Sequence, residues 1–294
     1  MSGNRFLLDD LGRIKRKARW QIQRIAQRRR YPGLDGNRAP ILFVNSFPKS
    51  GTHLLKQVVT GLAEIGPFVE APEYFIPTYE ASTGRKRTQT EILEDLNSLR
   101  PGDIQIGHLH ATQENQAFLC RPDVVLFFIY RDPRDVVVSH AFFITSMTLT
   151  HVHHDFYVNE VTTLDERIRV SILGRPELKE IEFPNIRKRF APYMKWLECE
   201  EALVIRFEDL VKHRMDSLSR IWRYFQRCGY DLGVSKEVAL IAMGENINPS
   251  SSPTYRSGKV GSWREYFSEE NKALFKEVSG GLLIELGYEE DYLW

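Results

Sequence analysis

Two spacings of apolar residues run along the chain, and they predict alternating strands and helices. Short, nearly continuous apolar runs predict four buried strands, at Ile41–Phe47, Ile104–Leu109, Val124–Tyr130 and Ala202–Phe207. Apolar residues three or four positions apart predict helices at residues 52–65, 88–98, 133–146, 160–174, 185–199, 214–228, 234–245 and 268–286. Buried strands joined by helices are typical of a parallel β-sheet flanked by helices on both faces. We therefore predict an α/β fold.

The N-terminal residues predict a separate basic helix over Arg5–Arg30. Its apolar residues recur at helical steps: Leu7, Leu11, Ile14, Ala18, Ile22 and Ile25. Residues 1–40 hold eleven Lys/Arg and three acidic residues, a net charge of +8, whereas the whole chain carries only +1. We predict a basic amphipathic arm over residues 1–39 and one domain over residues 40–294. The arm either packs on that domain or contacts a membrane or a dimer partner.

Composition narrows the class of protein further. The chain has 294 residues, 27% of them charged, which is ordinary for a globular enzyme. The cysteines are far apart and form no Cys-x-x-Cys pair, so neither a disulfide framework nor a zinc site is predicted for Cys120, Cys199 and Cys228. The longest apolar run, Val124–Tyr130, is too short to cross a bilayer. Because no secretory signal pattern is visible, we expect a cytoplasmic protein. We also expect no nucleic-acid partner.

The first candidate site follows the strand Ile41–Phe47. A tight turn with one glycine, Gly51, leads from this strand into a helix, whose first N–H groups and dipole favour an anion. Lys49 adds a positive charge, and Ser50 and Thr52 add hydroxyl donors. The segment therefore predicts a phosphate or sulfate site. It is not a Walker A loop, because its lysine precedes the glycine instead of following it.

A second anion site is predicted where the strand Val124–Tyr130 ends. Arg131 follows the strand, Asp132 caps the next helix, and Ser139 lies two turns into that helix. Arg131 and Ser139 can therefore converge on one anion; the alternative is a capped helix with a structural Arg–Asp pair. Near the C-terminus, the polar loop Arg256–Trp263 contains two glycines and additional cations. Its alternative interpretation is a surface turn before a helix.

A candidate base lies at the end of the strand Ile104–Leu109. The carboxyl ends of parallel strands are where α/β proteins assemble their sites, and histidine can accept a proton near neutral pH. His108 and His110 are both candidates, because the pleat directs both side chains to the same face. A structural role for both is the third interpretation. A polar loop without a second set of ligands, and hence no metal site, is predicted for His151, His153 and His154.

Taken in order, these segments resemble the sulfotransferases that use 3'-phosphoadenosine-5'-phosphosulfate (PAPS), of the cytosolic and bacterial type. Pro48–Thr52 resembles the loop that binds the 5'-phosphosulfate, and Arg131 with Ser139 resembles the element that binds the 3'-phosphate. The resemblance extends over roughly residues 41–267. It implies a P-loop-like parallel sheet flanked by helices.

Three more segments carry the resemblance, with departures. Arg256–Trp263 is similar to the family's R-K-G-x-x-G-D-W loop, although serines replace its lysine and aspartate. The strand end resembles the family's T-H-L-P element, whose histidine is the general base, and this match selects His108. Phe207 begins a segment similar to the Y-E-D element and falls where an aromatic residue lies near the adenine. Leu54 stands where a tryptophan often stacks on that base.

The resemblance implies transfer of a sulfuryl group from PAPS to a hydroxyl or amine of a small-molecule, lipid or glycan acceptor, with adenosine 3',5'-bisphosphate (PAP) as the product and no metal required. Lys49 would stabilise the leaving phosphate and His108 would be the base. The implied donor-binding residues are Lys49, Ser50, Gly51, Thr52, His53, Arg131, Ser139, Phe207, Arg256, Ser257, Gly258 and Lys259. The alternatives are a P-loop-type nucleotide kinase or NTPase and a non-catalytic nucleotide-binding scaffold.

The acceptor is the least defined part of this prediction. Residues 68–80 mix aromatic side chains with carboxylates shortly after the first predicted helix of the domain. They either line an acceptor pocket, which would favour a cationic or polyhydroxylated molecule, or form a surface loop. A short apolar stretch at residues 142–147 either adds a wall to that pocket or packs in the core.

Overall fold

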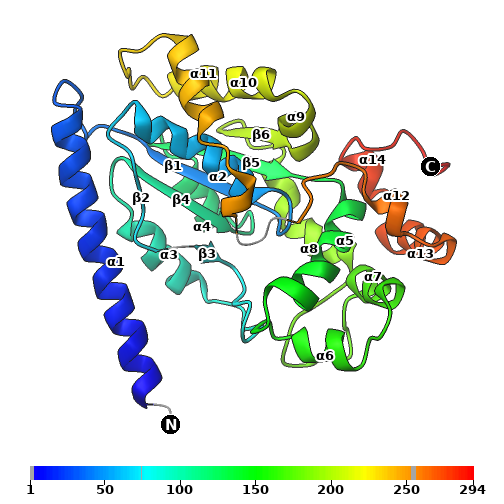
Figure 1. Ribbon diagram of the computed structural model, residues 1–294. Helices are drawn as coiled ribbons and strands as arrows, with labels where there is room; N and C mark the ends of the chain where they lie inside the picture. The colour runs from blue at the N-terminus through cyan, green and yellow to red at the C-terminus, as the bar shows by residue number, and fades with distance from the viewer. Residues whose placement is uncertain (1–2, 74, 253–255) are drawn as a thin grey trace.

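The structure is a computed structural model that describes residues 3–73, 75–252 and 256–294, leaving aside the side chains of residues 3–11 and 13 (Figure 1). Its centre is one sheet with the strand order β2-β4-β1-β5-β6, and β3 pairs with β4. Neighbouring strands are all parallel. Their bounds are β1 (Ile41–Ser46), β2 (Val69–Glu70), β3 (Ile76–Pro77), β4 (Asp103–His108), β5 (Val124–Tyr130) and β6 (Ala202–Arg206). The four long strands confirm the predicted ones, whereas β2 and β3 were not predicted.

Helices cover both faces of the sheet, as Figure 1 shows, and the α/β fold is confirmed. Alternate residues of a strand face opposite layers. Leu42 and Val44 of β1 are fully buried in one core, and Phe43 is fully buried in the other. The first core is closed by α2 (Thr52–Thr60), α10 (Arg214–Gln226) and α11 (Lys236–Glu245). The second is closed by α3 (Gln89–Ser98), α4 (Gln113–Leu119), α5 (Pro133–Phe142), α7 (Leu164–Leu173), α8 (Ile186–Phe190), α13 (Glu269–Ser279) and α14 (Leu282–Glu285).

Some predicted helices break or change type where the backbone turns. The prediction of one helix over residues 268–286 is wrong, because Gly280 is left-handed (φ 52°) and separates α13 from α14. The prediction of one α-helix over residues 185–199 is wrong after Phe190, where α8 ends. Pro192 cannot donate the next helical hydrogen bond, and a 3-10 helix follows (Ala191–Trp196).

Other predicted helices differ in type or in their first residue. The helices predicted over residues 52–65 and 133–146 are present, but residues 61–64 continue α2 as a 3-10 helix and residues 143–147 continue α5 as a π-helix. The helix predicted to start at residue 160 starts after Thr163, whose side chain caps it by accepting from the backbone N–H of Glu166. Three short helices besides α4 were not predicted: α6 (His154–Asn159), α9 (Phe207–Lys212) and α12 (Trp263–Tyr266).

The helix α1 (Gly3–Arg30) confirms the predicted N-terminal helix, and a buried carboxylate holds it to the sheet. Asp103, at the start of β4, is fully buried and accepts hydrogen bonds from Trp20 Nε1 and Arg24 Nη1, both at 2.8 Å. Burial raises the pKa of the Asp103 carboxyl, and these donors oppose the rise. The contact therefore fixes the C-terminal half of α1 on the edge of the molecule.

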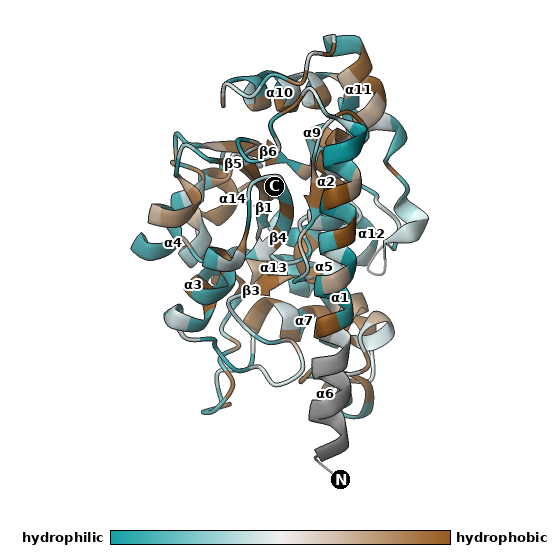
Figure 2. Ribbon diagram, turned by 90° about the vertical axis from the view of Figure 1, so that its left-hand side faces the viewer, coloured by the Kyte–Doolittle hydropathy of each residue, from teal (hydrophilic) through white to brown (hydrophobic). Residues whose placement is uncertain are grey.

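The apolar stripe of α1 faces away from the body of the protein. Ile14, Ile22 and Ile25 are 63%, 67% and 52% exposed, so the interpretation that this stripe packs on the domain is wrong for these residues. Leu7 and Leu11 lie outside the described side chains. Figure 2 views α1 from outside, where apolar and polar residues alternate along it. None of the described helices is both long and apolar enough to span a membrane.

Two of the cysteines meet although they are far apart in sequence. The sulfur atoms of Cys120, which ends α4, and Cys199, which precedes β6, lie 3.1 Å apart. The side chain of Glu201 joins them, and the three ligating atoms lie within 4.8 Å of one another. All three cysteines of the chain are free thiols. Sequence spacing gave no sign of this group, because the sheet brings its members together.

Candidate active site

The predicted site residues gather around one cavity at the carboxyl ends of four strands. The turn after β1, the last residue of β4, the residue after β5 and the residue after β6 all line it. The cavity has a volume of about 750 Å³. Neighbouring parallel strands end at the same edge of a sheet, and here the chain runs to β4 on one side of β1 and to β5 on the other. This is the usual position of a ligand site in an open α/β sheet.

The turn between β1 and α2 has an unusual backbone. Lys49 has a φ of 68°, the single positive φ among the described non-glycine residues, and Gly51 has a φ of 99°. A Cβ atom at position 51 would lie 2.5 Å from the ring of Phe207, so the turn requires glycine there. The Ser50 hydroxyl is buried without a hydrogen-bond partner. Such a hydroxyl is uncommon in folded proteins, but Ser50 does not line the cavity.

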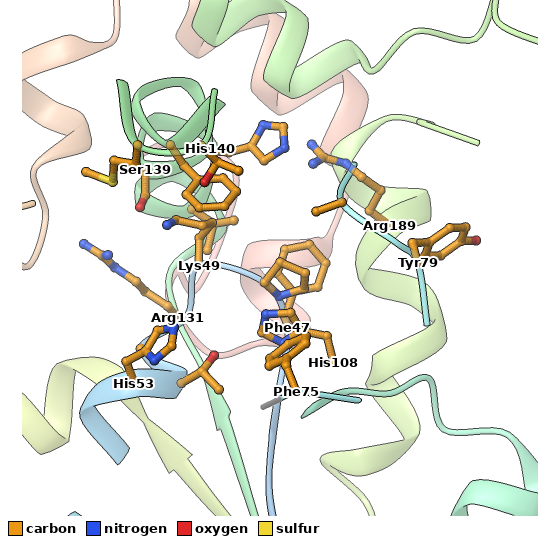
Figure 3. A pocket seen from close by; sticks show the side chains of 18 of the residues that line it. Phe47, Lys49, His53, Phe75, Tyr79, His108, Arg131, Ser139, His140 and Arg189 are labelled. Atoms are coloured by element: carbon orange, nitrogen blue, oxygen red, sulfur yellow. The ribbon is translucent and has the colours of Figure 1, made fainter. Parts of the chain in front are cut away.

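Among the cations that line the cavity, three come from the segments with predicted anion sites: Lys49, Arg131 and Arg256. Burial, aided by repulsion from both arginines, lowers the pKa of the Lys49 ammonium to about 7. Its Nζ lies 4.0 Å from the centre of the Phe143 ring rather than beside a carboxylate. Figure 3 shows Lys49 and Arg131 on the same side of the cavity. Cations held this close together are stabilised by an anion between them.

Arg131 is oriented by a carboxylate that sequence reasoning missed. The buried Asp135 pairs with the Arg131 guanidinium at 3.1 Å, and the carbonyl of Lys259 accepts a second hydrogen bond at 2.7 Å. Asp135 also accepts from the backbone N–H groups of Gly261 and Trp263, both at 2.8 Å. One side chain therefore joins the β5–α5 connection to the loop over residues 256–263. The structural Arg–Asp pair exists alongside the cavity, so the two interpretations of this segment are compatible.

Most of the predicted donor-binding residues line the same cavity. Those that do are Lys49, Gly51, Thr52, His53, Arg131, Ser139, Phe207, Arg256, Ser257 and Gly258. Phe207 lies beneath the Arg131 guanidinium, 4.4 Å from its ring centre, and touches the turn at Gly51. Ser50 and Lys259 do not line the cavity. The Lys259 ammonium pairs instead with Glu265 at 3.2 Å on the surface.

His108 is connected to the β1–α2 turn by short hydrogen bonds. Its Nδ1 lies 2.9 Å from the carbonyl oxygen of Ser46 and 3.0 Å from the Ser46 hydroxyl, which in turn lies 2.6 Å from the Thr52 hydroxyl. A carbonyl can only accept, so Nδ1 carries the hydrogen and Nε2 keeps its lone pair. Burial, with smaller contributions from His53 and Lys49, lowers the pKa of His108 to about 3. The imidazole is therefore neutral and able to accept a proton at Nε2.

The sulfotransferase domain family matches residues 40–287. The chain belongs to the sulfotransferase family. It is 21% identical over 194 residues to Sulfotransferase 6B1 of Danio rerio, a match that spans 64% of this chain and 61% of the relative. It is 22% identical over 250 residues to the 3-alpha-hydroxysteroid sulfotransferase of Cavia porcellus, spanning 79% of this chain and 80% of that one.

Solved structures show the same fold. A mouse sulfotransferase complexed with PAP has a TM-score of 0.54 at 16% identity and covers 88% of each chain. Retinol dehydratase in complex with retinol and PAP has a TM-score of 0.53 at 16% identity, covering 87% of this chain and 83% of that one. The expected family and the P-loop-like α/β fold are confirmed. A kinase or NTPase, which was the alternative, belongs to a different family.

His110 shares the cavity with His108 in this member of the sulfotransferase family, as the strand pleat predicted. Its ring lies 5.0 Å from Tyr193 and 5.6 Å from Tyr79, and burial lowers its pKa to about 4. Of the two histidines, His108 is the one whose ring nitrogen is hydrogen-bonded to Ser46, the last residue before the β1–α2 turn.

The polar loop predicted around His151 borders the cavity. His151 and His153 line the cavity together with His140 of α5, whereas His154 begins α6, which was not predicted. Among the described residues, no group of three metal-ligating side chains includes them. The sequence does not indicate that His140 lies beside His151 and His153, because His140 is more than ten positions away in another element.

Proposed function

We propose that this member of the sulfotransferase family transfers a sulfuryl group from PAPS to a hydroxyl or amine of a small-molecule acceptor. The observation that carries the proposal is the convergence of Lys49, Arg131 and Arg256 on a cavity that also contains a neutral histidine. PAPS carries anionic groups at both ends of one adenosine, which suits cations supplied from two separate segments. The family match over residues 40–287 supports the same donor class.

We assign the two ends of the donor to different parts of the cavity. The 5'-phosphosulfate would lie at the β1–α2 turn, where Lys49, Thr52 and the helix N-terminus offer positive charge and donors. The 3'-phosphate would lie between Arg131 with Ser139 and the loop that begins at Arg256. The buried Nε of Arg131, which lines the cavity and has no hydrogen-bond partner, favours the second of these assignments. Phe207, Ser257, Gly258 and His53 would line the nucleoside between them.

His108 would act as the general base. Its Nε2 accepts the acceptor's proton as the acceptor oxygen or nitrogen forms a bond to sulfur, and the bond from sulfur to the bridging oxygen breaks. Lys49 stabilises the negative charge on the departing 5'-phosphate. A positioned cation of this kind typically lowers a barrier by about 3–4 kcal/mol. The negative charge of the bound donor would also raise the pKa of both groups, which makes Lys49 a full cation and His108 a stronger base.

Nucleotide binding tests the proposal most directly. PAP without a metal should raise the melting temperature, whereas ATP with Mg²⁺ should not. Incubation with PAPS and a panel of phenols, alcohols, amines, hydroxylated lipids and glycan precursors should then release PAP with at least one acceptor. Stabilisation by ATP with Mg²⁺ alone would contradict the donor assignment. PAP binding without any PAP release across the panel would favour a non-catalytic nucleotide-binding protein.

We further propose that residues 40–294 act as one domain and that the arm over residues 1–39 contacts an anionic lipid surface. The support for the contact is the exposed stripe of Ile14, Ile22 and Ile25 on a helix that belongs to the +8 segment. Exposed apolar side chains flanked by Lys and Arg are typical of helices that lie in a membrane interface. Asp103 would hold the helix on the protein edge while its outer face meets the lipid.

Vesicle binding separates this contact from a dimer contact. The protein should bind phosphatidylserine-containing vesicles, bind pure phosphatidylcholine vesicles more weakly, and dissociate at high salt. Ile22→Glu should weaken the binding, and Ile241→Glu is the matched control, because Ile241 is 56% exposed on α11. Equal binding by both variants, or dimerisation that Ile22→Glu abolishes, would overturn the assignment to lipid.

A further inference from the structure

The wall of the cavity opposite Lys49 contains a partly buried guanidinium that has no counter-charge among the described residues. Arg189, on α8, lines the cavity and donates through Nη2 to the backbone carbonyl of Ser171, while its Nε is buried without a partner. Within the described residues, no carboxylate forms an ion pair with it. Figure 3 shows Arg189 and Tyr79 on the side of the cavity away from Lys49 and Arg131. A buried charge is normally paired, so this one indicates a ligand.

Neutral histidines and one aromatic ring surround this guanidinium. Arg189 lies 4.7 Å from the centre of the Phe183 ring, on which His140 also stacks at 5.3 Å and His153 packs at 4.6 Å. Burial and the Arg189 charge lower the pKa of both imidazoles, that of His153 to about 4. Burial lowers the pKa of Arg189 only to about 10, so it stays a cation at neutral pH. The cluster thus presents a net positive charge and neutral donors.

The carboxylates near this wall are already paired with other cations. Glu182 accepts from Tyr79 at 2.7 Å and pairs with Lys86 at 3.5 Å, and Glu80 pairs with Arg85. The sequence-based preference for a cationic or polyhydroxylated acceptor rested on the carboxylates of residues 68–80. Of these, Glu80 pairs with Arg85 and Glu70 pairs with Lys56. Among the described residues, Arg189 and the exposed Lys188 are the cations of this wall that form no ion pair, and Arg189 is the more buried of the two.

We propose that Arg189 binds an anionic group of the acceptor, so that the acceptor is an acid that carries its reactive hydroxyl or amine at the opposite end. The guanidinium offers a planar pair of donors that matches a carboxylate, sulfate or phosphate. The remaining wall between it and His108 is largely aromatic, with Phe47, Tyr193 and Phe183 among its residues. The acceptor class is therefore an aromatic or otherwise apolar hydroxy acid. This inference rests on the proposed sulfuryl transfer at the same cavity.

The test compares acids with their uncharged esters. The probes are 4-hydroxybenzoate, 4-hydroxyphenylacetate and 3-(4-hydroxyphenyl)propionate, each paired with its methyl ester, titrated into the PAP-saturated protein by calorimetry. At least one acid should bind about 10- to 100-fold more tightly than its ester, as expected for hydrogen bonds to a charged group. That preference should disappear in Arg189→Leu. Equal or tighter binding of all three esters would overturn the inference.

Two variants distinguish ligand binding from a structural role. Arg189→Lys keeps the charge but loses the planar pair of donors, so it should keep only part of the acid preference. A purely structural role of Arg189 would leave the acid preference unchanged in this variant. Arg187→Leu is the matched control in the same helix, because Arg187 is exposed and pairs with Glu285 at 2.7 Å on the surface. It should leave the preference unchanged. If Arg189→Leu fails to fold, a reduced acid preference in Arg189→Lys supports the inference, and a preference in Arg189→Lys equal to that of the wild type overturns it.

The outcome is separable from that of the proposed function. PAP affinity is measured first for the wild type and for each variant, and none of the Arg189 or Arg187 variants should change it. A wild-type protein that does not bind PAP would refute the donor assignment. The acid-to-ester ratio measured without PAP would still decide whether Arg189 binds an anion.

Discussion

The buried carboxylate of Asp135 allows a quantitative test of how the candidate site is held together. It accepts from the backbone N–H groups of Gly261 and Trp263 at 2.8 Å and pairs with Arg131 at 3.1 Å. Its exposed fraction is 0%. In Asp135→Asn the charge is lost and an NH₂ group replaces one acceptor oxygen. At least one of these buried donors is then left without a partner.

The expected loss of stability can be worked out from this burial. Removing one partner of a buried ion pair costs about 3–5 kcal/mol. Because 1 kcal/mol lowers the melting temperature of a domain of this size by about 2 °C, Asp135→Asn should melt about 6–10 °C below the wild type. Asp123→Asn is the matched control. Asp123 is 61% exposed beside Arg121, and such pairs contribute about 0–1 kcal/mol.

The assay is thermal unfolding followed by circular dichroism, with PAP titration by calorimetry at a temperature where both proteins are folded. PAP affinity should fall as well in Asp135→Asn, because the same carboxylate orients Arg131 and the loop over residues 256–263. A melting temperature equal to that of Asp123→Asn would refute the reasoning about the buried pair. A lowered melting temperature with unchanged PAP affinity would refute its connection to the donor site.

The remaining predictions concern the cavity itself. His108→Ala should lower turnover by about 100-fold or more, and His110→Ala by much less, in an assay of PAP release; the reverse order would make His110 the base. Arg131→Ala should weaken PAP binding by about 10- to 100-fold in calorimetry, and an unchanged affinity would exclude its assigned role. PAP binding at pH 8 should take up protons, because the free Lys49 ammonium, with a pKa of about 7, is mostly deprotonated there and the bound anions restore its charge. Affinity should therefore fall as the pH rises above 7. Calorimetry in two buffers of different ionisation enthalpy measures this uptake, and none at pH 8 would contradict it.

The strands and most of the donor-site residues could be predicted from the sequence because their signals are local. Val124–Tyr130 is an uninterrupted apolar run with a helix cap directly after it, and β5 has the same bounds. The turn around Lys49 combines glycine, hydroxyls and a cation within five positions. Parallel strands then bring such turns to one edge of the sheet. Elements without a local signal, such as β2 and α9, were missed.

The other half of the cavity could not be predicted, because its contacts join distant parts of the chain. The residues near Arg189 in the sequence do not indicate that its guanidinium lacks an ion pair with a carboxylate. In the sequence, His140 is one polar residue of a predicted helix. Only the structure shows that its ring stacks on Phe183. The orientation of α1 is a related case. Its apolar stripe left open whether the helix packs on the domain or contacts a membrane or a dimer partner. In the structure Trp20 and Arg24 reach Asp103, and the isoleucines are exposed.

The left-handed backbone of Lys49 sets activity against stability at one position. A non-glycine residue with a φ of 68° is strained by about 1–2 kcal/mol, and the buried ammonium beside two arginines adds to that strain. Lys49→Gly should relax the turn and raise the melting temperature while it lowers turnover by about 100-fold or more. A selection for heat resistance alone would therefore favour loss of this lysine. A selection that includes catalysis would retain it and accept a less stable enzyme.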